Sequence, residues 1–151
     1  MKILTTKEAN TNLWVIFFLW PLGALITSIK YYRQNWAKNG LWIFIVFFGF
    51  TFIVQEGQDS SRYIEHFLAF RSSHADFSTL ADALYSEGSR YIDIFQPLVT
   101  MLVAQFTGDP RILMAVFALF FGFFYSRHIW YLIDRNEGKL NLYLVTLLLV
   151  F

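Results

Sequence analysis

The side chains that can do chemistry gather in one interval of the sequence, residues 55–93. This interval contains seven acids, three arginines and two histidines: Glu56, Asp59, Glu65, Asp76, Asp82, Glu87, Asp93, Arg62, Arg71, Arg90, His66 and His74. Carboxylates and imidazoles can accept protons, and arginines can bind anions through paired N–H donors. The spacing does not match a zinc or calcium site, so we expect no metal ion. The chain has no cysteine, which excludes disulfides and thiolate chemistry.

Three apolar runs without charged residues flank this interval, at 13–29, 39–55 and 112–126. The chain is 56% hydrophobic and contains 18 Phe, 8 Tyr and 5 Trp. A hydrocarbon core about 30 Å thick needs roughly 20 helical residues, which the runs reach with their interfacial flanks. In a soluble protein, three such runs would leave too little amphipathic surface to cover them. We therefore predict an all-α fold, a polytopic transmembrane helical bundle.

The distribution of positive charge predicts how this bundle is oriented. A cationic loop follows the first apolar run, at Lys30, Arg33 and Lys38. The positive-inside rule places that loop in the cytoplasm and the N-terminus outside. A span at about 13–29, kinked by Pro21, and a second at about 41–55 then bring the loop 56–90 to the extracytoplasmic side. The net charge of +1 and the lack of a basic stripe predict no nucleic-acid partner.

Apolar residues recur at helical spacing inside this extracytoplasmic loop. The spacing predicts one amphipathic helix through Tyr63, Ile64, Phe67, Leu68 and Phe70. It predicts a shorter one through Leu80, Ala81, Leu84 and Tyr85, with Ser78 as a candidate N-cap. Two short helices lying along the membrane surface would satisfy both patterns.

The segment 91–107 is apolar but has two interpretations. It contains Asp93, Gln96, Pro97 and Gln105, and it ends at a break over 107–110. It either spans the membrane or re-enters it. Cations after the helix expected at 111–127 favour re-entry, because the positive-inside rule prefers them in the cytoplasm. A further apolar run over 140–151 predicts the start of another span, and we expect residue 151 to be a truncation point.

Two short motifs resemble those of a known family. Gly57, Asp59 and Tyr63 follow the second apolar run, and Pro97 with Leu98 lies in the segment 91–107. This pattern resembles the EpsG-like polysaccharide polymerases, relatives of the Wzy O-antigen polymerases, over roughly residues 41–150. The chain departs from the family's pattern in two ways: it has Gln55 and Glu56 where the family has an arginine, and Gln96 where it has a glutamate. The layout is also similar to GT-C membrane glycosyltransferases, a likeness that implies that 91–107 spans the membrane.

The resemblance implies an enzyme of the bacterial inner membrane that joins polyprenyl-diphosphate-linked sugar repeats into an exopolysaccharide, capsule or O-antigen. Its expected partners are that lipid-linked oligosaccharide, the bilayer and other polysaccharide assembly proteins, without a cofactor. A carboxylate, Asp59 or Glu56, would accept the proton of the attacking hydroxyl. Arginines would stabilise the diphosphate leaving group. The expected substrate-binding residues are Arg62, Tyr63, Arg90, Asp93 and Gln96.

Other interpretations of these residues stay open. Asp59 and Asp93 can each cap a helix instead, and Arg62 can pair with Glu65 or Glu56. Tyr63 can serve packing alone. Two other function classes are also open, a non-enzymatic transporter or flippase of lipid-linked sugars and a different membrane transferase such as an acyltransferase. A transporter should carry charges in mid-helix, and the predicted spans carry none.

Overall fold

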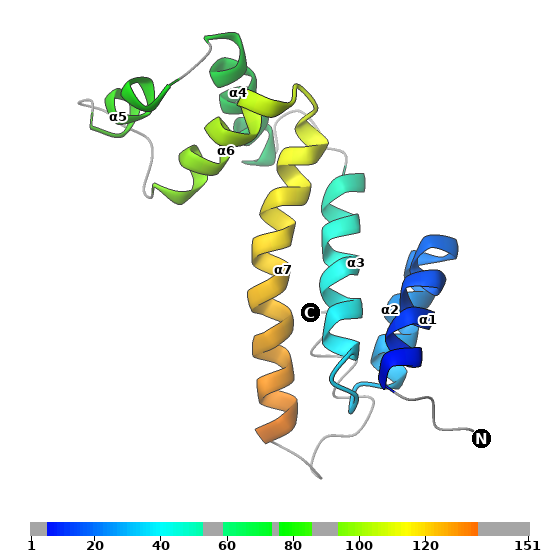
Figure 1. Ribbon diagram of the computed structural model, residues 1–151. Helices are drawn as coiled ribbons and strands as arrows, with labels where there is room; N and C mark the ends of the chain where they lie inside the picture. Colours follow the sequence, from blue (N-terminus) through cyan, green and yellow to red (C-terminus); the bar gives the residue numbers. More distant parts are fainter. Residues whose placement is uncertain (1–5, 53–58, 74–75, 86–93, 136–151) are drawn as a thin grey trace. The chain divides into compact units, whose positions relative to one another are not determined.

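The computed structural model describes residues 6–52, 59–73, 76–85 and 94–135, and the regular structure in these ranges is entirely helical (Figure 1). The helices are α1 (Thr6–Leu19), α2 (Pro21–Lys30), α3 (Ala37–Thr51), α4 (Asp59–Ser72), α5 (Phe77–Tyr85), α6 (Phe95–Phe106) and α7 (Pro110–Arg135). The all-α prediction is confirmed for this part of the chain. The chain divides into two compact units, a first unit of residues 1–49 and 117–151 and a second unit of residues 50–116.

The first apolar run forms two helices and not the single span expected at 13–29. Trp20 separates them, because its backbone angles of φ −156° and ψ 89° are not helical. Pro21 occupies the first helical position of α2, where its fixed φ is favourable and its missing N–H costs nothing. Helices α1 and α2 pack against each other as an antiparallel hairpin. The prediction of a kinked but continuous helix is therefore wrong.

Small residues let this hairpin approach α3 closely. A Cβ atom at Gly40 of α3 would collide with the hydroxyl of Ser28 and would lie 3.3 Å from Leu13 Cδ1. The Ser28 hydroxyl donates to the Ala24 carbonyl at 2.8 Å, so this buried polar group is satisfied inside its own helix. Leu13 on α1 and Ser28 on α2 thus meet at the same point on α3, which fixes the antiparallel register of the hairpin.

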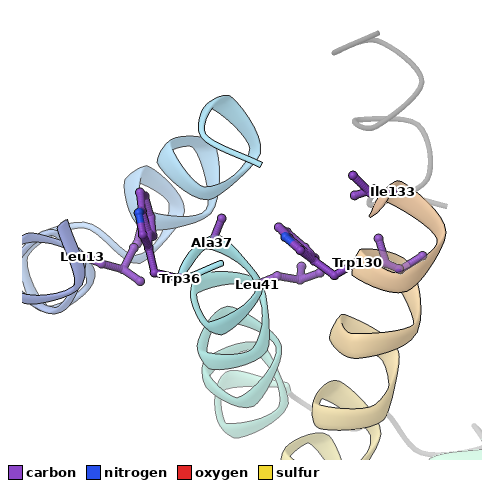
Figure 2. Close-up of a cluster of buried hydrophobic side chains, with 8 residues drawn as sticks. Leu13, Trp36, Ala37, Leu41, Trp130 and Ile133 are labelled. Carbon is purple, nitrogen blue, oxygen red and sulfur yellow. The ribbon is translucent and has the colours of Figure 1, made fainter. Parts of the chain in front are cut away.

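Helix α3 and the C-terminal part of α7 form an antiparallel pair in the first unit. Trp42 Nε1 donates to the Leu119 carbonyl at 2.9 Å, and Trp130 Nε1 donates to the Tyr32 carbonyl at 3.0 Å. A Cβ at Gly122 would lie 2.9 Å from Ile45 Cγ2, so glycine is required for this close approach. Figure 2 shows the buried cluster between these elements, made by Leu13, Trp36, Ala37, Leu41, Trp130 and Ile133 with Ala24 and Ile129.

The second unit is built around the packing of α4 and α5 on α6. Phe67 and Phe70 are the buried side chains of α4, and Met101 is buried on α6. Helix α5 begins one residue before the N-cap that we predicted at Ser78. The hydroxyl of Ser78 instead donates to the Asp76 carboxylate at 2.7 Å, and the Asp76 carbonyl accepts the N–H of Leu80.

The break predicted over 107–110 separates α6 from α7. Asp109 acts as the N-cap of α7, because its carboxylate accepts the N–H of Arg111 at 2.9 Å. The Thr107 hydroxyl accepts the N–H of Asp109 at 3.1 Å, and Pro110 takes the first helical position. The residues that form this turn all belong to the second unit.

Among the described residues, only α7 is long and apolar enough to cross a membrane. Its 26 residues rise about 39 Å, and only 22% of its most apolar window is buried. Helices α3 and α6 are apolar but shorter, with 15 and 12 residues. The helix expected at 111–127 is therefore present and continues to Arg135, whereas the run at 140–151 lies outside the described residues.

Candidate functional site on helices α4 and α6

Four of the seven predicted site residues lie on two helices that pack against each other. Asp59, Arg62 and Tyr63 belong to α4, and Gln96 belongs to α6. Glu56, Arg90 and Asp93 lie outside the described residues. The packing of α4 on α6 thus brings residues 33 to 37 positions apart in the sequence into one small helical unit.

The register of α4 gathers its chemical residues on one face. Positions 59, 62, 63 and 66 have the spacing i, i+3, i+4, i+7, which places them on one side of a helix. Arg62 is exposed, and Tyr63 and His66 are half-buried. This face adjoins the buried stripe of Phe67 and Phe70, so it lies along the edge of the contact with α6.

Helix α4 begins at Asp59, so this residue lies in the first helical turn. A negative charge is favourable there, because the first turn presents unpaired N–H groups and the positive end of the helix dipole. Capping and substrate contact both remain open predictions for Asp59.

Gln96 lies in the first turn of α6, directly before Pro97. Pro97 is fully buried, and its lack of an N–H costs nothing so close to a helix start. The backbone carbonyl of Gln96 accepts the Thr100 hydroxyl at 2.8 Å, and its side chain is half-buried. The Pro–Leu motif thus opens a helix, and it places a neutral amide at the helix entrance.

Arg71 joins the ends of α4 and α6. One guanidinium nitrogen donates to the Ala104 carbonyl at 2.8 Å and to the Gln105 carbonyl at 3.2 Å. These are among the last carbonyls of α6, which lack helical partners and lie at the negative end of the dipole. The contact makes Arg71 a positioning residue that sets how α6 lies on α4, a role that its place in the sequence did not predict.

The described ranges contain no group of three or more His, Asp or Glu residues that could hold a metal ion. The side chains on α4 and α6 can accept a proton through a carboxylate or imidazole and can bind an anion through a guanidinium.

No family model, curated protein or solved structure matches this chain. The EpsG-like motifs therefore stand alone as the indication of a family, and that assignment stays a hypothesis. The residues that indicate a function are those on one face of α4, in the second unit.

A residue that the sequence did not single out is Arg127 in the first unit. We expected the helix to end there, but α7 continues for two further turns to Arg135. The Arg127 guanidinium donates to Asn39 Oδ1 at 3.0 Å and to the Ser126 hydroxyl at 2.9 Å. Its carbon Cζ lies 4.3 Å from the ring centroid of Phe123 and 5.1 Å from that of Trp42. The charge is thus held by neutral and aromatic groups, a recognised cation–π environment.

Proposed function

We propose that this chain belongs to a membrane polymerase that joins polyprenyl-diphosphate-linked sugar repeats into a surface polysaccharide. The observation that carries the proposal is the single face of α4 formed by positions 59, 62, 63 and 66, on a helix that packs against the Pro97-containing start of α6. An acid, an arginine, a tyrosine and a histidine at these positions combine a proton acceptor, an anion binder and a surface on which a sugar can stack.

The topology of the first unit supports a location outside the cytoplasm for this face. Because α3 and α7 are antiparallel there, the chain leaves after residue 49 and returns at residue 117 at the same end of the pair. The second unit therefore crosses the bilayer an even number of times. Its one apolar helix of ten or more described residues is α6, whose 12 residues rise about 18 Å, short of a core about 30 Å thick.

This even number favours re-entry of α6 over a span. It also agrees with the positive-inside rule, since Lys30, Arg33 and Lys38 lie before or at the N-terminal end of α3. We place the second unit on the extracytoplasmic face of the inner membrane, where a polyprenyl diphosphate is exposed at the headgroup level. The multi-pass topology is part of the proposal.

The proposed reaction transfers one sugar chain between two lipid carriers or onto a free sugar end. A hydroxyl of the acceptor sugar attacks the anomeric carbon of the donor, and the bond from that carbon to the diphosphate oxygen breaks. The diphosphate leaves with the electron pair, and Arg62 stabilises its charge. The carboxylate of Asp59 or Glu56 accepts the hydroxyl proton. Tyr63, Arg90, Asp93 and Gln96 would contact the sugars or the diphosphate.

A specific observation favours a second candidate, a transporter or flippase of lipid-linked sugars. Arg127 lies inside α7 and is held by Asn39, so the helices do carry a charge within an apolar segment. A charge that two packed helices hold between them, here near the basic end of the first unit, can line a substrate path in a transporter. A flippase would need Arg127 and tolerate loss of the α4 face, whereas a polymerase would need the α4 face.

The test is polymer length in a host that lacks the gene and carries wild-type or variant protein. Asp59→Asn and Arg62→Ala should leave single repeat units in place of long chains, with normal amounts of protein in the membrane. Glu65→Gln is the matched control, because this acid is exposed on the same helix but lies off the face. Normal polymer in Asp59→Asn and Arg62→Ala would refute the polymerase proposal. Loss of all lipid-linked sugar outside the cytoplasm in Arg127→Leu alone would favour the flippase.

A further inference from the structure

We propose that the α1–α2 hairpin enters the bilayer from the basic side of the first unit and returns without crossing it. The cations at its base would bind the phosphates of an anionic phospholipid leaflet. This inference rests on the membrane location proposed above but not on the polymerase activity.

The length of the hairpin fits one leaflet. The ten residues of α2, from Pro21 to Lys30, rise about 15 Å, half of a hydrocarbon core about 30 Å thick. Leu13 and Ser28 meet at Gly40, so α1 runs back beside α2 and does not extend it. The chain therefore returns to the side from which it entered, and the start of α1 lies on the cytoplasmic side in this proposal, in place of the outer side that the charge count predicted for the N-terminus.

The tip of the hairpin is strongly apolar and exposed. The exposed fractions of Phe18, Leu19 and Trp20 are 79%, 82% and 58%. No charged residue occurs from position 13 to position 29. A tip of this kind is unfavourable in water, since burial of apolar surface contributes roughly 25 cal/mol per Å². Hydrocarbon chains would cover it.

Part of the backbone at the tip is paired within the protein, as a medium without water requires. Inside a bilayer, every backbone N–H and C=O group needs a partner within the protein. The N–H of Trp20 donates to the Ile16 carbonyl at 2.7 Å, and the carbonyl of Trp20 accepts the N–H of Ala24 at 3.1 Å. Pro21 has no N–H to satisfy. The non-helical residue between the two helices is thus paired on both sides.

The base of the hairpin has the opposite character. Lys30, Arg33 and Lys38 lie in or next to the turn from α2 to α3, among Tyr31, Tyr32 and Trp36. Trp130 holds α7 to this turn through the Tyr32 carbonyl. Interfacial tyrosine and tryptophan with lysine and arginine are typical of the headgroup level.

The positive charge at this end of the first unit favours anionic lipid headgroups as the binding partner. In the described part, α7 adds Arg127 and Arg135 and a single acid, Asp134. A polybasic surface next to an apolar insertion attracts anionic lipid headgroups, at about 1 kcal/mol, or roughly fivefold, per cation near the surface. The order of apolar tip, aromatic belt and cationic base therefore matches one anionic leaflet.

Cysteine labelling tests the path of the hairpin, because the chain has no native cysteine. Single substitutions Asn12→Cys and Gln34→Cys mark the base, and Phe18→Cys marks the tip. With a membrane-impermeant maleimide, both base sites should label in inverted vesicles and neither in intact cells. The tip site should label only after detergent solubilisation. Labelling of Asn12→Cys and Gln34→Cys from opposite sides would show a span, and aqueous labelling of Phe18→Cys would show an exposed tip. Either result overturns the proposal, and neither depends on polymer synthesis.

The preference of the protein for anionic over zwitterionic lipid tests whether the cations at the base of the hairpin bind phospholipid headgroups. Brominated phosphatidylglycerol and brominated phosphatidylcholine, each in vesicles with the purified protein, report headgroup preference by quenching tryptophan fluorescence. We expect a preference for phosphatidylglycerol that falls by up to about fivefold in Arg33→Gln. Arg111→Gln is the control, an exposed cation in the second unit, and should leave the preference unchanged. Equal quenching by both lipids in the wild type, or an equal loss in both variants, would refute the lipid-binding base.

Discussion

In the first unit, helices approach each other at glycine, alanine and serine, so that backbones come close and side chains interlock around them. In the second unit, α4 and α6 pack through larger residues, Phe67 and Met101, and are joined at one end by Arg71. Small residues at helix contacts are characteristic of association in membranes, where close packing replaces the hydrophobic effect. Aromatic packing with charged ends suits an interface with water.

This contrast suggests different roles for the two units, a structural one for the first and a chemical one for the second. The candidate reactive face lies in the second unit, on helices of 12 to 14 residues. The first unit contributes the helix pair α3 and α7 and the hairpin that anchors them. We therefore expect the first unit to be sensitive to side-chain volume and the second to the loss of polar contacts at helix ends.

The largest effect is expected for Gly40→Val in the first unit. The new side chain would collide with the Ser28 hydroxyl and crowd Leu13, forcing the hairpin away from α3. Overpacking of this kind costs about 3 kcal/mol. Unfolding of the purified protein in detergent, followed by tryptophan fluorescence, measures the loss. Gly108→Ala is the control, since nothing lies within 4 Å of a Cβ there, and it should change stability by less than about 0.5 kcal/mol.

Arg127→Leu should come next, at about 2 kcal/mol. It removes a charged hydrogen bond to Asn39, 88 positions away in the sequence, and leaves that side-chain oxygen without its donor. A double-mutant cycle with Asn39→Ala isolates the pair. A coupling energy close to zero would mean that the contact does not hold α3 to α7.

A smaller loss, about 1 kcal/mol, is expected for Asp109→Ala at the start of α7, because it removes the acceptor for the Arg111 N–H. Asp109→Asn keeps a side-chain oxygen at the N-cap and should retain most of the stability. Helix content measured by circular dichroism during thermal unfolding compares the two variants. If both lose equally, the charge and not the cap is responsible.

The smallest effect on stability, about 0.5–1 kcal/mol, is expected for Arg71→Met, because the guanidinium caps the end of α6 at the protein surface. If the chain is the proposed polymerase, the effect of Arg71→Met on polymer length should be larger than its effect on stability, since α6 would lose its fixed position on α4. A stability loss above that of Gly40→Val would contradict the contrast between the two units.

The sequence correctly predicted the elements that depend on a few neighbouring residues. The spacing of Tyr63, Phe67 and Phe70 predicted α4, and two of the three side chains are buried in the structure. The Gly108–Pro110 break predicted the boundary between α6 and α7. Both follow from a few neighbouring residues, because helix periodicity and proline geometry act over short distances.

Contacts between distant residues explain what the sequence did not predict. Pro21 is compatible with a kink or with a new helix, and the choice depends on how α2 packs beside Leu13 and Gly40. The sequence placed Arg127 at the end of a helix, because its contact with Asn39 on a distant helix has no local signal. The anchoring of Arg71 by carbonyls of α6, 33 and 34 positions later, has no local signal. The spacing of residues in the sequence could predict the face of α4. It could not predict that this helix packs against α6.

The interleaved order of the two units along the chain has a consequence for biosynthesis. The hydrogen bond from Trp130 to Tyr32 closes a loop of 98 positions, and the second unit is the contiguous stretch inside it. Closing long loops is entropically costly, and non-local contacts form late. As the chain emerges from the ribosome, residues 50–116 can complete their contacts before α7 exists in full. The α1–α2 hairpin and α3 are made earlier but gain their last partner only when α7 is complete, and this delayed docking should be the slow step of assembly.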